Sequence, residues 1–259
     1  MTDAVQPNAS ASRVQNAIQN ASRATGVNFD LLVQTARRES ALNPTARAST
    51  SSATGLFQFI ESTWLDTVRK YGAEHGLGEY AQQIGVRDGR PYVADSQARS
   101  EILALRNDPD ASARMAAELT QQNAATLQTR FGRAPNASEL YAAHVMGTGG
   151  AIRLIEAAQS GAADASALFP REAAANRGLF FASGEPLSAQ GVLEKLSLNA
   201  DVSASSAVSA TTSETPMSPG LAHALFAMAL LPLLTGSDNR ESDAFDALKA
   251  YARAQRAGL

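Results

Sequence analysis

Glu39 is the side chain of this sequence whose setting best suits acid–base chemistry. Apolar residues recur at helical spacing within residues 29–38, which predicts an amphipathic helix with one buried face. Asn43-Pro44 should stop this helix, because the residue before a proline is pushed out of the α region. Glu39 then lies in the last helical turn, where the helix dipole disfavours an anion and should raise the pKa of the carboxyl group. A glutamate in that position can serve as a general acid.

The alternative for Glu39 is a solvated helix-end residue that pairs with Arg37 or Arg38, because many surface ion pairs contribute little beyond that. The residues that follow favour the chemical interpretation. A small polar loop, residues 45–54, leads from the helix end to a short segment of aromatic residues and glutamine. The whole pattern is Glu39-Ser40-x-x-Asn43-Pro44-x-Ala46, then Ser49, then Ala53-x-Gly55-Leu56-Phe57-Gln58.

This pattern resembles the soluble lytic transglycosylase (SLT) family, whose members have a lysozyme-like fold and cleave peptidoglycan. In that family the glutamate that begins the motif is the catalytic acid, and a Gly-Leu-Met-Gln element lines the glycan cleft. The resemblance implies that Glu39 is catalytic and that Ser49, Phe57 and Gln58 bind the sugar or position the carboxylate. The sequence departs from the family at Phe57, which replaces the methionine, and at Ser52, which stands where glycine is usual.

Residues 138–151 form the second informative segment. They predict a helix that ends near Gly147, a glycine turn, and a further helix over residues 151–158. In the SLT family a late helix carries Ala-Tyr-Asn-Ala-Gly, whose tyrosine reaches the catalytic glutamate. Aligned on Gly147, His144 takes the place of that tyrosine, and Tyr141 lies three residues earlier on the same helix face. Either side chain could hydrogen-bond Glu39, and His144 could equally be a buried core histidine.

The resemblance implies a reaction that needs one carboxylate. Glu39 would protonate the oxygen between N-acetylmuramic acid and N-acetylglucosamine, while the substrate's own acetamido group stabilises the cation. The same carboxylate would then take the proton of the muramyl 6-hydroxyl, which closes a 1,6-anhydro ring. One alternative is a muramidase that hydrolyses the same bond with Glu39 and a second carboxylate such as Glu61, although Glu61 is expected to be exposed. The other is a non-catalytic structural protein that holds peptidoglycan.

The elements that position these residues are expected to be helices, because alanine is abundant and no segment shows the alternating pattern of a strand. The fold class is therefore all-α. The resemblance implies a lysozyme-like transglycosylase domain over residues 12–198, after a disordered N-terminus over residues 1–11. Trp64 is expected in the core of that domain. Helices are predicted over residues 12–24, 62–71, 94–105 and 110–131, with a glycine-rich excursion over residues 72–91.

The rest of the chain is predicted to be an appendage. Residues 199–218 are mostly Ser, Ala and Thr, which cannot bury enough apolar surface to order themselves and form a linker. Residues 219–259 predict an apolar and amphipathic helical tail. Its apolar run, residues 221–234, is shorter than the ~20 residues that span a bilayer. We expect it either to dock on a membrane or on a partner such as secretion or flagellar machinery, or to serve as a short membrane anchor.

The composition limits the classes of partner and cofactor that the chain is expected to bind. A net charge of −3 gives no basic field for nucleic acid. With no cysteine and three scattered histidines, we expect neither a metal nor another cofactor. The expected partner is the glycan strand of peptidoglycan. The first residues are polar and do not resemble a secretory signal peptide, so the expected location, the periplasm or cell envelope, follows from the implied activity and the export route stays open.

Overall fold

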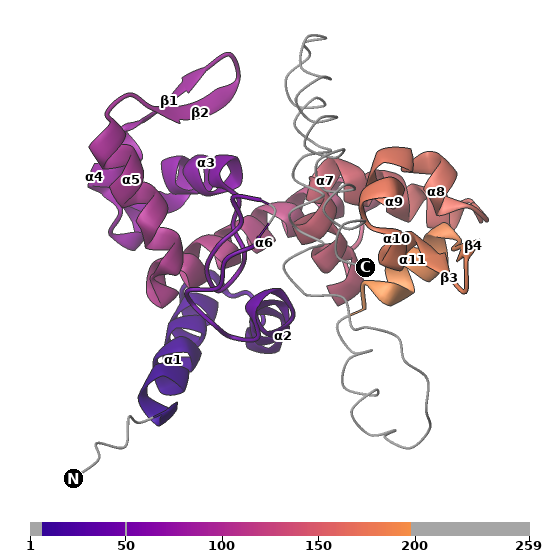
Figure 1. Cartoon of the computed structure of the whole chain (residues 1–259), viewed down its shortest axis with the longest axis horizontal. Helices are drawn as coiled ribbons and strands as arrows, with labels where there is room; N and C mark the ends of the chain where they lie inside the picture. Colours follow the sequence, from indigo (N-terminus) through magenta and orange to yellow (C-terminus); the bar gives the residue numbers. More distant parts are fainter. Residues whose placement is uncertain (1–6, 50, 198–259) are drawn as a thin grey trace, which may run out of the picture.

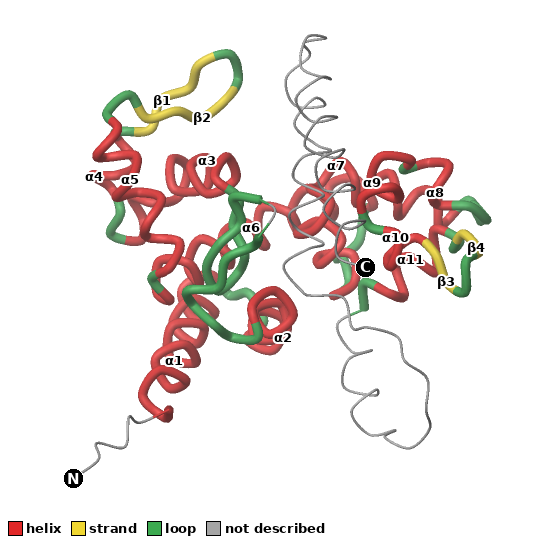
Figure 2. The backbone as a smooth tube through the Cα atoms, in the orientation of Figure 1, coloured by secondary structure: helices red, strands yellow, loops and turns green. Residues whose placement is uncertain are grey.

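The computed structural model describes residues 7–49 and 51–197, which are mainly helical (Figure 1). Figure 2 shows the helices joined by loops and two short pairs of strands. The all-α fold class is thereby confirmed. The helices are α1 Pro7–Thr25, α2 Phe29–Ser40, α3 Glu61–Tyr71, α4 Gly78–Gln82, α5 Ser96–Ala104, α6 Pro109–Phe131, α7 Ala137–Gln159, α8 Ala165–Leu168, α9 Pro170–Ala175, α10 Arg177–Phe180 and α11 Ala189–Lys195. The 3-10 turns η1 Gly72–His75 and η2 Leu105–Asn107 join α3 to α4 and α5 to α6.

The start of α1 corrects one predicted boundary. The helix begins at Pro7 rather than at Ser12, so the expected disordered N-terminus does not extend to residue 11. Proline suits the first helical position, because the missing N–H would have no intrahelical partner there and its φ is already helical. No residue between Pro7 and Ser12 breaks a helix, and the chain therefore continues helically through this polar segment.

Two short antiparallel hairpins interrupt the helices of the described chain. β1 Ile84–Arg87 pairs with β2 Arg90–Val93, and β3 Phe181–Ala182 pairs with β4 Glu185–Pro186. The first hairpin lies at the end of the segment that the sequence left as an excursion. Its turn is Asp88-Gly89, and both residues have positive φ, 52° and 73°. An Asp-Gly pair commonly forms such a tight two-residue turn.

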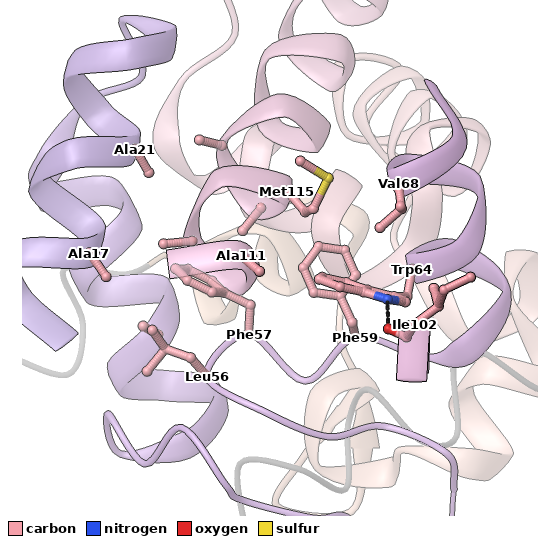
Figure 3. Packing of buried hydrophobic residues seen from close by; sticks show 14 of the residues in the cluster. Ala17, Ala21, Leu56, Phe57, Phe59, Trp64, Val68, Ile102, Ala111 and Met115 are labelled. Atoms are coloured by element: carbon pink, nitrogen blue, oxygen red, sulfur yellow. Dashed lines mark hydrogen bonds between the residues drawn. The ribbon is translucent and has the colours of Figure 1, made fainter. Parts of the chain in front are cut away.

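The first of two hydrophobic clusters gathers α1, α3, α5, the first half of α6 and the segment that follows the polar loop. Phe59 and Trp64 meet edge to face, with ring centroids 5.2 Å apart. Figure 3 shows the indole nitrogen of Trp64 directed at the carbonyl of Ile102, to which it donates a hydrogen bond of 2.7 Å. Trp64 is fully buried, and its expected place in the core is confirmed.

The second cluster is built by α7 and the short helices α8 to α11. α6 belongs to both clusters, because Met115 lies in the first and Leu127 in the second. It runs from one group of helices to the other (Figure 1). α2 also touches both: Leu32 is buried in the first cluster, whereas Leu31 packs against the second. α2 therefore lies where the two clusters meet.

The predicted appendage lies outside the described residues, including the linker over residues 199–218 and the tail over residues 219–259. Within residues 7–49 and 51–197, no helix has the length and apolar character needed to cross a membrane.

Candidate active site

Glu39 lies in the last turn of α2, as the sequence predicted. The helix is capped by Asn28, whose side-chain oxygen accepts a hydrogen bond of 3.0 Å from the backbone N–H of Leu31. It ends in two successive left-handed residues, Ala41 and Leu42, with φ of 52° and 64°. Glu39 itself is only 2 % exposed. The carboxyl group is thus buried at the negative end of the helix dipole, a setting that favours the neutral acid.

Two side chains of α7 meet this carboxyl group. The hydroxyl of Tyr141 donates a hydrogen bond of 2.8 Å to Glu39 Oε1. His144 Nε2 lies 3.5 Å from the same oxygen, and the His144 ring carries a charge only when it is protonated. The two rings stack, with centroids 5.9 Å apart and planes 19° from parallel. The sequence left open which of the two reaches Glu39, and the structure brings both to it, with the hydrogen bond made by Tyr141.

Gly147 sets the course of α7 after these two residues. Its φ of 68° and ψ of 162° break the helical path in the middle of α7, which resumes directly afterwards. A positive φ is strained for residues with a Cβ, so glycine suits this position. Beyond the kink, the Thr148 hydroxyl donates a hydrogen bond of 2.8 Å to the side chain of Asn123 on α6. The predicted break near Gly147 is therefore present as a kink within one helix.

Ser40 fastens the end of α2 to the segment that follows the polar loop. Its buried hydroxyl lies 3.0 Å from the carbonyl oxygen of Ala36 and 2.8 Å from that of Leu56. The second contact joins residues far apart in the sequence and restrains the chain next to Glu39. Ser40 is part of the sequence motif, but the motif did not predict this positioning role. Its place directly after the glutamate was the available signal.

The loop itself is held by Arg106, which sequence reasoning missed. The guanidinium group donates hydrogen bonds of 2.7 Å to the carbonyl of Ser52 and 3.1 Å to that of Phe59. Burial lowers the pKa of Arg106 below its usual value, and the nearby carboxylate of Glu61 acts in the opposite direction. The Arg106 backbone also approaches Gly55 so closely that a Cβ there would lie 1.9 Å from the Arg106 carbonyl oxygen. No pattern in the sequence links these positions.

The other three residues expected at the site, Phe57, Gln58 and Ser49, differ in their exposure to solvent. Phe57 is fully buried in the first cluster, where Figure 3 shows its ring among core side chains, so it supports the loop from within. Gln58 is also buried, and its amide nitrogen donates to the carbonyls of Gly55 at 2.9 Å and Ala46 at 3.2 Å. Ser49 is exposed on the polar loop. Of these three, Ser49 alone presents its side chain to solvent.

Glu61 is less exposed than the sequence suggested. Its side chain is 33 % exposed and forms an ion pair with Arg99 of α5. It opens α3, where a carboxylate is favoured by the positive end of the helix dipole. The cause of the difference is a partner from a distant helix, which the sequence around Glu61 does not reveal.

These contacts place a buried carboxyl group beside a hydroxyl donor at the meeting of two hydrophobic clusters, an arrangement that can give up a proton and take one back. Comparison with protein families adds a match: the model described as Transglycosylase SLT domain covers residues 16–82. The matched segment runs from within α1 to the end of α4 and includes Glu39 and the polar loop. Tyr141 and His144 lie beyond it, on α7.

Proposed function

We propose that this chain, whose residues 16–82 match the SLT domain of the lytic transglycosylase family in the lysozyme-like superfamily, cleaves peptidoglycan. The bond cut is the β-1,4 bond between N-acetylmuramic acid and N-acetylglucosamine, and the products carry 1,6-anhydromuramyl ends. The SLT domain supports a peptidoglycan lytic transglycosylase-type activity in general. The observation that carries the finer proposal is the buried Glu39 carboxyl group with the Tyr141 hydroxyl at 2.8 Å from Oε1.

In the first step Glu39 acts as a general acid. Its proton moves to the glycosidic oxygen, the bond between that oxygen and C1 of the muramyl sugar breaks, and the bonding electrons leave with the oxygen. Positive charge develops at C1, where the substrate's acetamido group stabilises it. Burial and the helix end favour the protonated form of Glu39 before this step. Tyr141 then donates its hydrogen bond to a carboxylate, and such a charge-assisted bond is stronger than one to a neutral acid.

In the second step the Glu39 carboxylate acts as a general base. It takes the proton of the muramyl 6-hydroxyl while the oxygen of that hydroxyl bonds to C1, and the 1,6-anhydro ring closes. Glu39 is returned to the acid form and no water is consumed. Ser49, exposed on the polar loop, is the proposed sugar contact of that loop. Phe57 and Gln58 act indirectly, by supporting the loop from the core.

The muramidase alternative needs a second carboxylate that can activate water or attack the sugar. Glu61 was the candidate for this role, and its ion pair with Arg99 supports the scheme with one carboxylate instead.

Digestion of purified sacculi by the full chain, with mass spectrometry of the soluble products, tests this function. We expect anhydromuropeptides from the wild type and from Glu61→Gln, and a loss of about 10²-fold or more with Glu39→Gln, since general acids contribute on that scale. Products with reducing ends, lost in Glu61→Gln, would establish the muramidase. Binding to sacculi without release of fragments by any of the three proteins would establish the non-catalytic binder.

The proposed substrate also sets the proposed location. A chain that cleaves peptidoglycan works in the periplasm or cell envelope, and fractionation of cells with detection of the full chain would test this.

A further inference from the structure

Arg38, the residue before Glu39, binds a distant part of the chain. Its guanidinium group donates to the carbonyl of Lys195 at 2.9 Å and to those of Leu196 and Ser197 at 3.4 Å each. These carbonyls lie at the last residue of α11, at its C-cap and just beyond it. The last carbonyl groups of a helix lack intrahelical partners, and the helix dipole is negative there. A guanidinium group placed there donates hydrogen bonds to these carbonyl groups and is attracted by the negative end of the dipole. Arg38 thus ties α2 to the last described helix.

The same guanidinium group covers the ring of Tyr141. Its Cζ lies 4.7 Å from the ring centroid, within the range of a cation–π interaction. The cation draws electron density from the phenol and makes the O–H a stronger donor. That O–H is the one bound to Glu39. A chain of direct contacts therefore runs from the end of α11 through Arg38 and Tyr141 to the proposed acid.

Arg37, the neighbouring arginine on α2, provides a comparison for Arg38. It stands next to Arg38 on α2 and is exposed, whereas Arg38 is half-buried. Holding a long side chain in one geometry costs conformational entropy, so a fixed Arg38 needs compensating contacts. The three carbonyls and the tyrosine ring supply them. A guanidinium group suits this position better than an ammonium group, because it is planar and can stack on a ring while its N–H groups bind several acceptors.

We propose that Arg38 is a positioning residue for Glu39: held by the end of α11, it fixes the Tyr141 ring and strengthens the hydrogen bond that Tyr141 donates to the Glu39 carboxylate. Its effect on turnover rests on the proposed function, but its effect on the Glu39 carboxyl group does not. Two titratable side chains of α7, Tyr141 and His144, lie against Glu39, and Arg38 of α2 reaches it through the tyrosine.

The first test measures the ionisation of Glu39 without any substrate. The full chain is labelled with ¹³C at glutamate carboxyl carbons, the Glu39 signal is assigned with Glu39→Gln, and its pKa is measured in wild type, Arg38→Gln and Arg37→Gln. A strengthened Tyr141 donor stabilises the Glu39 carboxylate. Loss of the Arg38 cation should therefore raise the pKa of Glu39 in Arg38→Gln, whereas in Arg37→Gln the pKa of Glu39 should keep its wild-type value. If Arg38→Gln does not fold, Arg38→Lys replaces it, and a smaller rise is expected.

The decisive measurement is whether the effect of Arg38 on the pKa of Glu39 depends on the Tyr141 hydroxyl. In the Tyr141→Phe background, Arg38→Gln should cause a smaller rise than in wild type, because the hydroxyl through which Arg38 acts is gone. On sacculi, Arg38→Gln should lower the maximal rate about two- to fivefold with little change in KM, the scale of one cation–π contact.

An unchanged pKa of Glu39 in a folded Arg38→Gln protein would overturn the inference, and so would the same rise with and without the Tyr141 hydroxyl. A lower melting temperature with an unchanged pKa would reduce Arg38 to a tie between helices. If the pKa rises as expected while wild type releases no fragments from sacculi, the proposed function fails and the positioning role stands.

Discussion

Tyr141→Phe is the change that tests the proposed acid most directly. It removes the hydroxyl that donates to Glu39 Oε1 at 2.8 Å and keeps the buried ring. A hydrogen bond to a neutral acceptor contributes about 1 kcal/mol and one to a charged acceptor about 1.5–3 kcal/mol. Tyr141 should therefore favour the carboxylate over the acid by about 0.5–2 kcal/mol. Since the carboxylate develops as the proton leaves, we expect kcat to fall about 2- to 30-fold with little change in KM.

The pH dependence of the rate should change in a defined direction. A donor that prefers the carboxylate holds the pKa of the acid down, so its removal raises the pKa of Glu39. The first step needs the protonated acid, and the rate therefore falls as pH rises through that pKa. In Tyr141→Phe this fall should move to higher pH.

Initial rates of fragment release from sacculi, measured across pH with the full chain, provide the assay. Tyr92→Phe is the matched control, because it removes a tyrosine hydroxyl from the first hairpin instead of from α7. The Tyr92 ring centroid lies 4.3 Å from Arg87 Cζ. This variant should retain the wild-type rate and pH profile. A folded Tyr141→Phe protein with kcat within about twofold of wild type and an unmoved profile would refute the reasoning.

Two further predictions concern stability. Gly55→Ala should destabilise the fold by about 3 kcal/mol or more in urea unfolding, because its Cβ would lie 1.9 Å from the Arg106 carbonyl oxygen. Gly89→Ala, also at positive φ but with nothing within 4 Å, should cost only about 1–2 kcal/mol, and equal losses would contradict this account. In Arg133→Gln the free energy of unfolding should fall less between neutral and acid pH than in wild type, because hydrogen bonds from Arg133 hold the pKa of Glu139 below its usual value. That stabilisation is present above about pH 4.3 and is lost as pH falls through the folded-state pKa; an unchanged loss of stability between neutral and acid pH in the variant would contradict it.

The local features of the site were predictable because they depend on neighbours in the sequence. The cap at Asn28 and the position of Glu39 in the last turn of α2 follow from side chains within a few residues. The same holds for the break at Gly147. The choice between Tyr141 and His144 was not predictable, because both lie on one face of α7 and only the packing of α7 against α2 decides which hydroxyl or ring nitrogen is nearer.

The roles of buried residues were harder to predict than their burial. Phe57 and Gln58 are part of the recognised motif, yet both are buried and support the loop from inside. Arg106 holds the same loop from a position about fifty residues later in the chain, and no periodicity records such a contact. The first hairpin did carry a local signal, the Asp88-Gly89 pair, but its strands are too short for an alternating pattern to stand out.

The division of the site between two hydrophobic clusters has a consequence for synthesis of the protein. A ribosome that has released the chain only as far as α6 has delivered Glu39 and the whole first cluster, but not Tyr141 or His144. Synthesis proceeds from the N-terminus, and domains generally fold as units during it. The unfinished chain therefore carries Glu39 without the Tyr141 hydroxyl, and the proposed cleavage of peptidoglycan can begin only when translation has supplied α7.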